Sequence, residues 1–130
     1  MIDHTGVVVS DFEKSKKFYR SSLSAIAYEL IMEIPAAVNG KTNVAGFGEL
    51  PKPDFWVIEG TPNKPPVHVA FRVGSRAIVD AFYKAALDAG GKDNGTPGVR
   101  AHYHPHYYGA YVLDPDGHNI EAVCHENPNA

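Results

Sequence analysis

Three residues of the sequence have side chains that can bind a metal ion, namely His4, His68 and Glu121. Both histidines lie beside short runs of β-branched and apolar residues, so we expect them on strands. Glu121 lies inside the apolar segment Asn119–Val123, where a charge is costly unless it is paired or bound to an ion. Imidazole and carboxylate groups both bind first-row metal ions. On rigid strands, these three side chains would form a site with open positions for water or substrate.

Each of these residues also fits an ordinary structural role. A single histidine on a strand is more often a surface or hydrogen-bonded residue than a ligand, and Glu121 on an edge strand would be a solvated charge. The metal site is favoured because the two histidines occupy equivalent positions of a sequence repeat. His68 lies 64 residues after His4. Residues of the same kind recur at this offset in both halves: Val9 and Val73, Phe18 and Phe82, Tyr19 and Tyr83, Arg20 and Lys84, and Leu23 and Leu87.

The repeat predicts an α+β fold in one domain, residues 1–130, with two tandem modules of the order β-α-β-β-β. Module one covers about residues 1–60 and module two about residues 66–125. Each module begins with a strand, at Thr5–Val9 and at Val67–Val73, followed by an amphipathic helix. Ser10 or Asp11 can cap the first helix and Ser75 the second.

Turn residues separate the remaining expected strands. Gly90 and Gly91 end the second helix, and Asp114–Gly117 forms a tight turn between two strands of a hairpin. The further strands are expected at Thr42–Phe47, Asp54–Ile58, Val99–His104, Tyr108–Leu113 and Asn119–His125.

The segment His102–Tyr108 contains three histidines and three tyrosines. Such side chains can bind a polar ligand or transfer protons near neutral pH. We expect His104 and Tyr108 to take part in catalysis, and Tyr103 to contact substrate together with Trp56, which would supply an apolar wall. The alternative is a polar loop whose aromatic rings cover the edge of the core.

The remaining histidines and the cysteine are expected to be structural. His106, His118 and His125 are predicted at the surface. Cys124, the one cysteine of the chain, is predicted to be a small core residue, because no nucleophile arrangement surrounds it.

Composition limits the class of protein. The chain is 44% hydrophobic and 21% charged, as in an ordinary globular domain. A net charge of -3 without a basic cluster gives no basis for nucleic-acid binding. No apolar run approaches the length of a membrane span, so we expect no membrane partner and a cytoplasmic location.

The strand that follows His4, the turn Asp114–Gly117 and the segment Asn119–Glu121 resemble the vicinal oxygen chelate superfamily. This superfamily contains glyoxalase I, extradiol dioxygenases, fosfomycin-resistance enzymes and bleomycin-resistance proteins, and the resemblance extends from Ile2 to Cys124. It implies a glyoxalase-like fold in which the two modules form a curved mixed sheet around a central metal cavity. It also implies His4, His68 and Glu121 as ligands of one divalent ion (Zn, Ni, Fe or Mn), and a homodimer.

A fourth ligand is an open question. Members that are similar to glyoxalase I have a second carboxylate, in the last strand of the first half. The repeat offset projects Glu121 onto Val57, which cannot bind a metal ion. Glu59 lies two residues further on and therefore keeps the strand face of Val57. Given an indel of two, Glu59 would serve as a ligand or as the catalytic base. Alternatively, Glu59 begins a loop. With Glu59 the ligand set suits Zn or Ni; without it, the 2-His-1-carboxylate set suits Fe(II) or Mn(II).

Three functions remain. The first is a metal-dependent glyoxalase-like lyase or isomerase that acts on a small substrate with vicinal oxygens. The second is an extradiol-type dioxygenase, although ring-cleaving members usually have an extra domain. The third is a metal-free drug- or metabolite-binding protein of the bleomycin-resistance type. A glutathione-specific glyoxalase is less expected, because no basic anchor for the glutathione carboxylates is evident beyond Arg72 and Arg100. Arg72 is expected to contact the substrate.

Overall fold

The computed structural model describes all 130 residues. The α+β class and the repeated β-α-β-β-β order are confirmed, with one short additional helix after the second strand. Module one contains β1 (Thr5–Val9), α1 (Phe12–Ser24), β2 (Glu29–Ile34), α2 (Ala36–Asn39), β3 (Val44–Gly48) and β4 (Phe55–Glu59). Module two contains β5 (His68–Arg72), α3 (Arg76–Asp88), β6 (Lys92–Val99), β7 (Tyr108–Leu113) and β8 (Asn119–Cys124).

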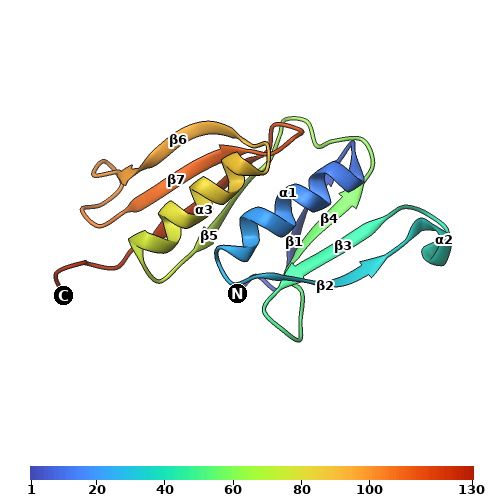
Figure 1. The fold of residues 1–130 in the computed structure, drawn as a ribbon, viewed down its shortest axis with the longest axis horizontal. Helices are drawn as coiled ribbons and strands as arrows, with labels where there is room; N and C mark the ends of the chain where they lie inside the picture. The colour runs from blue at the N-terminus through green and yellow to red at the C-terminus, as the bar shows by residue number, and fades with distance from the viewer.

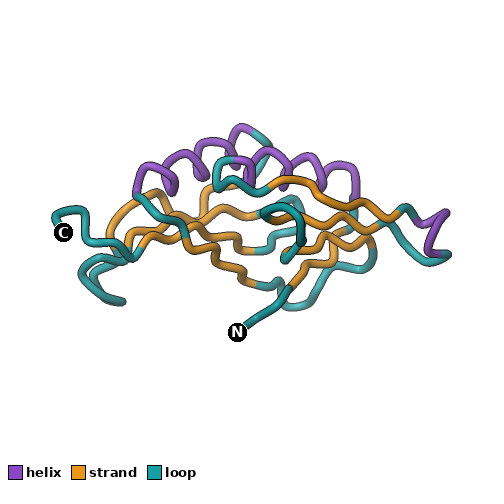
Figure 2. Tube along the Cα trace, turned by 90° about the horizontal axis from the view of Figure 1, so that it is seen from below, coloured by secondary structure: helices purple, strands orange, loops and turns teal.

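Each module forms its own four-stranded mixed sheet. The strand orders are β1-β4-β3-β2 and β5-β8-β7-β6, so that the first strand of each module pairs in parallel with the last. Strands β1 and β5 are edges of their sheets. Figure 1 shows α1 and α3 side by side, and Figure 2 shows both on one side of the strands. The other side, on which the N-terminus lies in Figure 2, is called the uncovered face below.

Local sequence signals explain where the two long helices begin. The Asp11 side chain accepts a hydrogen bond from the Lys14 backbone N–H at 3.1 Å, and Ser75 Oγ accepts one from Ile78 N–H at 3.2 Å. Both contacts satisfy N–H groups that lack a partner within the helix. None of the helices is long and apolar enough to cross a membrane.

Aromatic side chains join the cores of the two modules. Phe55 on β4 lies between Tyr19 on α1 and Phe71 on β5, with ring centroids 5.1 and 5.3 Å apart. Tyr28 packs edge-on against Phe71 at 5.5 Å. Because Phe71 belongs to module two, the hydrophobic core is continuous across the junction, and burial of these rings stabilises the arrangement of both modules.

The turn at Asp114–Gly117 also connects the modules. Asp114 is buried and accepts hydrogen bonds from the backbone N–H groups of Asp116 and His118, both at 2.9 Å. Its second oxygen accepts a 2.5 Å bond from the Tyr19 hydroxyl on α1. Asp116 in turn accepts a 2.5 Å bond from the Ser10 hydroxyl. The turn therefore fixes the start of β8 against module one.

The prediction that His118 lies at the surface is wrong, because its side chain is fully buried between the modules. The Val67 N–H donates to Nδ1 at 3.1 Å, so Nδ1 carries no proton. Nε2 therefore carries the proton and donates to the Val8 carbonyl at 2.9 Å. The imidazole therefore donates a hydrogen bond to a carbonyl of the edge strand β1 and accepts one from the chain just before β5.

The predicted strand Val99–His104 is also wrong. The strand is β6 (Lys92–Val99), and residues 100–107 form a loop. The sequence of β6 contains Gly95, Pro97 and Gly98, which normally mark loops. They are accommodated because β6 is an edge strand whose pairing with β7 is interrupted twice by shifts of register. Cys124 is buried, as predicted.

Replacing His118 with Phe should destabilise the protein by about 2 kcal/mol, because the Val67 N–H and the Val8 carbonyl lose their partner while the ring volume is retained. The measurement is the free energy of unfolding in urea. His102→Phe is the matched control: His102 is exposed, and its change should stay within about 0.5 kcal/mol. Equal stability of the two variants would show that the His118 contacts do not hold the modules.

Because the Tyr19 hydroxyl is buried, we expect the protein to lose stability at alkaline pH. Burial, and then the nearby Asp114 carboxylate, raise the pKa of Tyr19 well above its usual value of 10. The unfolded chain therefore releases this proton from about pH 10 upward while the folded protein retains it, so stability falls as pH rises. Tyr19→Phe should be less stable at pH 8 but lose stability less steeply between pH 9.5 and 11. Parallel curves of urea midpoint against pH would contradict this assignment.

Candidate metal centre

Glu121 is a buried carboxylate with two partners. Its side chain is 1% exposed, and His68 Nε2 lies 2.8 Å from Oε1. The other oxygen, Oε2, accepts a hydrogen bond from the Tyr107 hydroxyl. A buried carboxylate is stable only when its oxygens are paired, so these contacts explain how an acidic residue occupies the middle of an apolar strand.

Strand register places Glu121 and His68 on the uncovered face. The parallel pairing of β5 and β8 puts His68 beside Asn119, and Ala70 beside Glu121. Ile120 and Ala122 alternate with Glu121 and are fully buried in the core under α3, so Glu121 points the other way. The His68 side chain is 52% exposed, which leaves its ring accessible.

His4 is apart from this pair. It precedes β1, is exposed, and its Nδ1 lies 2.7 Å from Asp3. His4 and His68 line the same cavity of about 350 Å³, which also contacts Tyr28 and Asp54. Nevertheless, no group of three or more His, Cys, Asp or Glu residues lies close enough to hold an ion. The chain by itself brings together two of the three predicted ligands.

The position in module one that is equivalent to Glu121 is occupied by Trp56. The repeat aligns Gly6 with Ala70, and in the sheets Gly6 pairs with Trp56 whereas Ala70 pairs with Glu121. The sequence projection onto Val57 is therefore wrong by one residue. Because Trp56 has no metal-binding atom, module one supplies no equivalent carboxylate.

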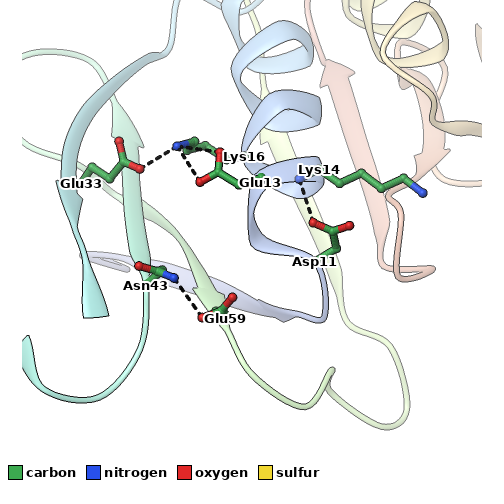
Figure 3. Close-up of polar contacts among 7 residues, drawn as sticks. All are labelled: Asp11, Glu13, Lys14, Lys16, Glu33, Asn43 and Glu59. Carbon is green, nitrogen blue, oxygen red and sulfur yellow. Dashed lines mark hydrogen bonds and ion pairs between the residues drawn. The ribbon is translucent and has the colours of Figure 1, made fainter. Parts of the chain in front are cut away.

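Glu59 lies on the opposite strand face from Trp56. It pairs with Val9 and shares its face with the buried Val57, on the side covered by the helices. Its carboxylate accepts a 3.0 Å hydrogen bond from Asn43 Nδ2, as Figure 3 shows. In this structure Glu59 is not placed to serve as a ligand or base on the uncovered face.

Trp56 forms an apolar wall on the uncovered face of module one. Together with His4, Val44 and Ile58, it lines a cavity of about 520 Å³. Gly46 makes room for it, since a Cβ at that position would lie 2.8 Å from the indole ring. Trp56 thus lines an open cavity, and its contact with a substrate stays a prediction.

Tyr108 lies on the covered side, contrary to its predicted catalytic role. Its hydroxyl donates to Asp80 on α3 at 2.7 Å. Tyr107 and Tyr111 occupy the uncovered face instead, and Tyr111 pairs directly with Glu121 across β7 and β8. Tyr107 and Tyr111 were not predicted as a pair, although the alternation of Tyr108 with the apolar Ala110 and Val112 indicates which residues share the opposite face.

The other predicted residues surround the site at greater distance. His104 Nε2 lies 2.8 Å from His125 Nδ1, which attaches the loop 100–107 to the end of β8. Tyr103 is 60% exposed, and its ring lies 4.8 Å from that of Tyr107. Arg72 is exposed on β5 and shares the strand face of His68.

Burial raises the pKa of Tyr107, and its hydrogen bond to Glu121 raises it further. Burial likewise raises the pKa of Tyr111. Tyr107 is therefore a protonated donor at neutral pH. Arg100 stacks on the Tyr111 ring at 5.4 Å and places a positive charge at this end of the face.

A larger cavity, of about 640 Å³, lies on the exposed side of α1 and has no hydrophobic lining residue. Lys16 lines it and is already paired, 2.6 Å from Glu33 and 3.2 Å from Glu13 (Figure 3). Salt bridges between exposed side chains are ordinary surface features. This charged helix surface is distinct from the candidate site.

Comparison with known proteins identifies the family. The profile of the Glyoxalase/Bleomycin resistance protein/Dioxygenase superfamily matches residues 1–122. The chain belongs to this superfamily. No curated protein is significantly similar in sequence.

Solved structures agree with this assignment. A glyoxalase/bleomycin resistance protein from Albidiferax ferrireducens T118 is 26% identical, with a TM-score of 0.71, over 95% of this chain and 98% of that one. A hypothetical protein from S. aureus is 25% identical, with a TM-score of 0.64, over 92% of each chain. A fosfomycin resistance protein from Listeria monocytogenes, solved with Mn(II) and sulfate, has the same fold at 18% identity, with a TM-score of 0.68, over 99% of this chain and 94% of that one.

The residues of module two fit a divalent ion. His68 and Glu121 supply a nitrogen and an oxygen donor already in contact, and the exposed side of His68 is open. Beside them, the side-chain carbonyl oxygen of Asn119 is buried and has no hydrogen-bond partner. The pair is thus a partial ligand set that one more protein ligand would complete.

Proposed function

We propose that this protein is a divalent-metal-dependent, glyoxalase-like enzyme of the lyase or isomerase class, acting on a small substrate with vicinal oxygens. The observation that supports it is the contact between the buried Glu121 and His68 on an accessible sheet face. When bound, the ion would supply a Lewis acid that polarises the substrate oxygens. His68 and Glu121 would bind it, with His4 as the third ligand.

His4 would reach the ion from a second copy of the chain. In a single chain His4 is not gathered with the other two ligands, although β1 and β5 are both edge strands available to a partner. A twofold dimer in which each His4 faces the partner's His68 and Glu121 would complete two equivalent sites. This arrangement would require the expected homodimer.

A second candidate is an extradiol-type dioxygenase. Because Trp56 occupies the place of a first-module carboxylate and Glu59 faces the helices, the ligand set contains two histidines and one carboxylate. Such a set with open positions favours Fe(II) or Mn(II) over Zn or Ni. In either enzyme Trp56 would contact the apolar part of the substrate, and Tyr103 and Arg72 its polar groups. His104 remains a candidate for proton transfer at the mouth of the site.

Protein purified without chelators and reconstituted with Mn(II), Fe(II), Ni(II) or Zn(II) should retain about one ion per chain by elemental analysis. Glu121→Gln and His68→Ala should each lose most of it, because the first removes the negative charge of the carboxylate ligand and the second removes the imidazole ligand. His102→Ala, which removes an exposed histidine outside the site, should retain the wild-type amount.

Other results of these experiments would favour a different function. No bound metal in the reconstituted wild-type protein would sink the enzyme proposal and favour a metal-free binding protein. Oxygen consumption by the Fe(II) form with a catechol would select the dioxygenase. Isomerisation without oxygen uptake would select the lyase or isomerase class.

Mixed dimers test the role of His4. In dimers of His4→Ala and Glu121→Gln chains, one site carries both changes and the other carries neither. Co-expression of the two variants should therefore restore about a quarter of the wild-type metal content, since about half of the dimers are mixed. Each variant alone should bind little. If the co-expressed chains bind no more metal than the separate variants, His4 does not act across the dimer.

A further inference from the structure

Tyr107 makes the two oxygens of Glu121 chemically different. Its hydroxyl donates to Oε2, whereas Oε1 lies 2.8 Å from the exposed ring of His68. Gly109 leaves room for this contact, since a Cβ there would lie 3.3 Å from Oε2 and 3.2 Å from the Tyr107 ring. One oxygen is thus held by the loop, and the other faces the proposed ligand partner.

The position of Tyr107 is fixed by its own loop. The Arg100 N–H donates to the Tyr107 carbonyl at 2.7 Å, and the Tyr107 N–H donates to the His104 carbonyl at 3.2 Å. The Tyr107 ring packs against Tyr103 and against His125, with centroids 4.8 and 5.3 Å away. A side chain held on both sides in this way can orient a neighbouring group.

We propose that Tyr107 is a positioning residue for Glu121, holding Oε2 so that only Oε1 binds the divalent ion. This inference rests on the proposed metal-dependent function. Carboxylates bind metal ions through one oxygen or two, and a hydrogen bond to one oxygen favours the first mode. Without the Tyr107 hydroxyl, the carboxylate is free to turn and bind through both oxygens, which uses a coordination position that substrate needs.

A phenol keeps its proton at neutral pH, so the Tyr107 hydroxyl remains a donor to Oε2. Tyr111 does not make this contact, because no hydrogen bond joins its hydroxyl to the Glu121 carboxylate. The loop 100–107 therefore supplies a contact that the strands of module two do not.

The test compares Tyr107→Phe with Tyr108→Phe. The two residues are adjacent, but the Tyr108 hydroxyl bonds to Asp80 on the covered side and should have no influence on the ion. Tyr107→Phe should weaken Mn(II) binding about tenfold or more, measured by titration, and Tyr108→Phe should leave it unchanged. Tyr107→Phe retains the ring contacts, and thermal unfolding of the Mn(II)-free proteins checks that both variants fold.

Infrared difference spectra of the Mn(II)-loaded minus the Mn(II)-free protein give a second readout, which no loss of stability would reproduce. The two carboxylate stretching bands are widely separated when one oxygen binds and close together when both bind. The wild-type protein should show the wide separation, and Tyr107→Phe the narrow one. Narrow separation in the wild type would overturn the proposal even if the variant did not fold.

The metal-dependent function and the positioning role of Tyr107 can be rejected separately. If wild-type protein binds no Mn(II), both the metal-dependent function and the role of Tyr107 are rejected. If the wild type binds Mn(II) and Tyr107→Phe behaves as Tyr108→Phe does, the metal site stands and the positioning role is rejected.

Discussion

The hydrogen bonds of the turn before β8 hold the two modules in one arrangement. Asp114 bonds to Tyr19, Asp116 bonds to Ser10, and His118 connects Val8 with Val67. No strand pairing joins the two sheets, so the junction depends on these polar contacts and on the shared aromatic core. A pair of β-α-β-β-β units can pack in several ways. Buried polar groups specify one of them, because any other packing would leave charged or hydrogen-bonding atoms unpaired.

The two modules have diverged on the uncovered face while they kept the same backbone. Module two presents His68 and Glu121, which are polar and suited to an ion. Module one presents Trp56 over Gly46, which is suited to an apolar surface. Under the proposed function, two equivalent positions of the sheets would therefore take two different tasks, ion binding and contact with the rest of a ligand. This asymmetry is consistent with one type of site in each chain rather than two.

Much of the fold follows from the sequence, because the repeat, the helix caps and the Asp114–Gly117 turn are local signals. The site was harder to predict, since strand faces depend on register. An offset of 64 residues aligned His4 with His68, but one residue of slippage before β4 moved the equivalent of Glu121 from Val57 to Trp56. A shift of one residue also reverses the face in the neighbouring pair Tyr107 and Tyr108: Tyr107 bonds to Glu121, whereas Tyr108 bonds to Asp80. His118 was misplaced because its partners are backbone groups distant in sequence.

Trp56 is the only tryptophan of the chain, and it lies half-buried on the face where a ligand would bind. The indole emission of this protein therefore comes from a single known place. Its intensity and wavelength depend on the water and the groups around one ring, beside His4 and Ile58. Collections of small molecules can be screened optically with the unlabelled protein, because a compound that binds beside Trp56 changes the surroundings of the one indole ring. Trp56 thus gives the protein an intrinsic optical probe at the position that is equivalent to Glu121.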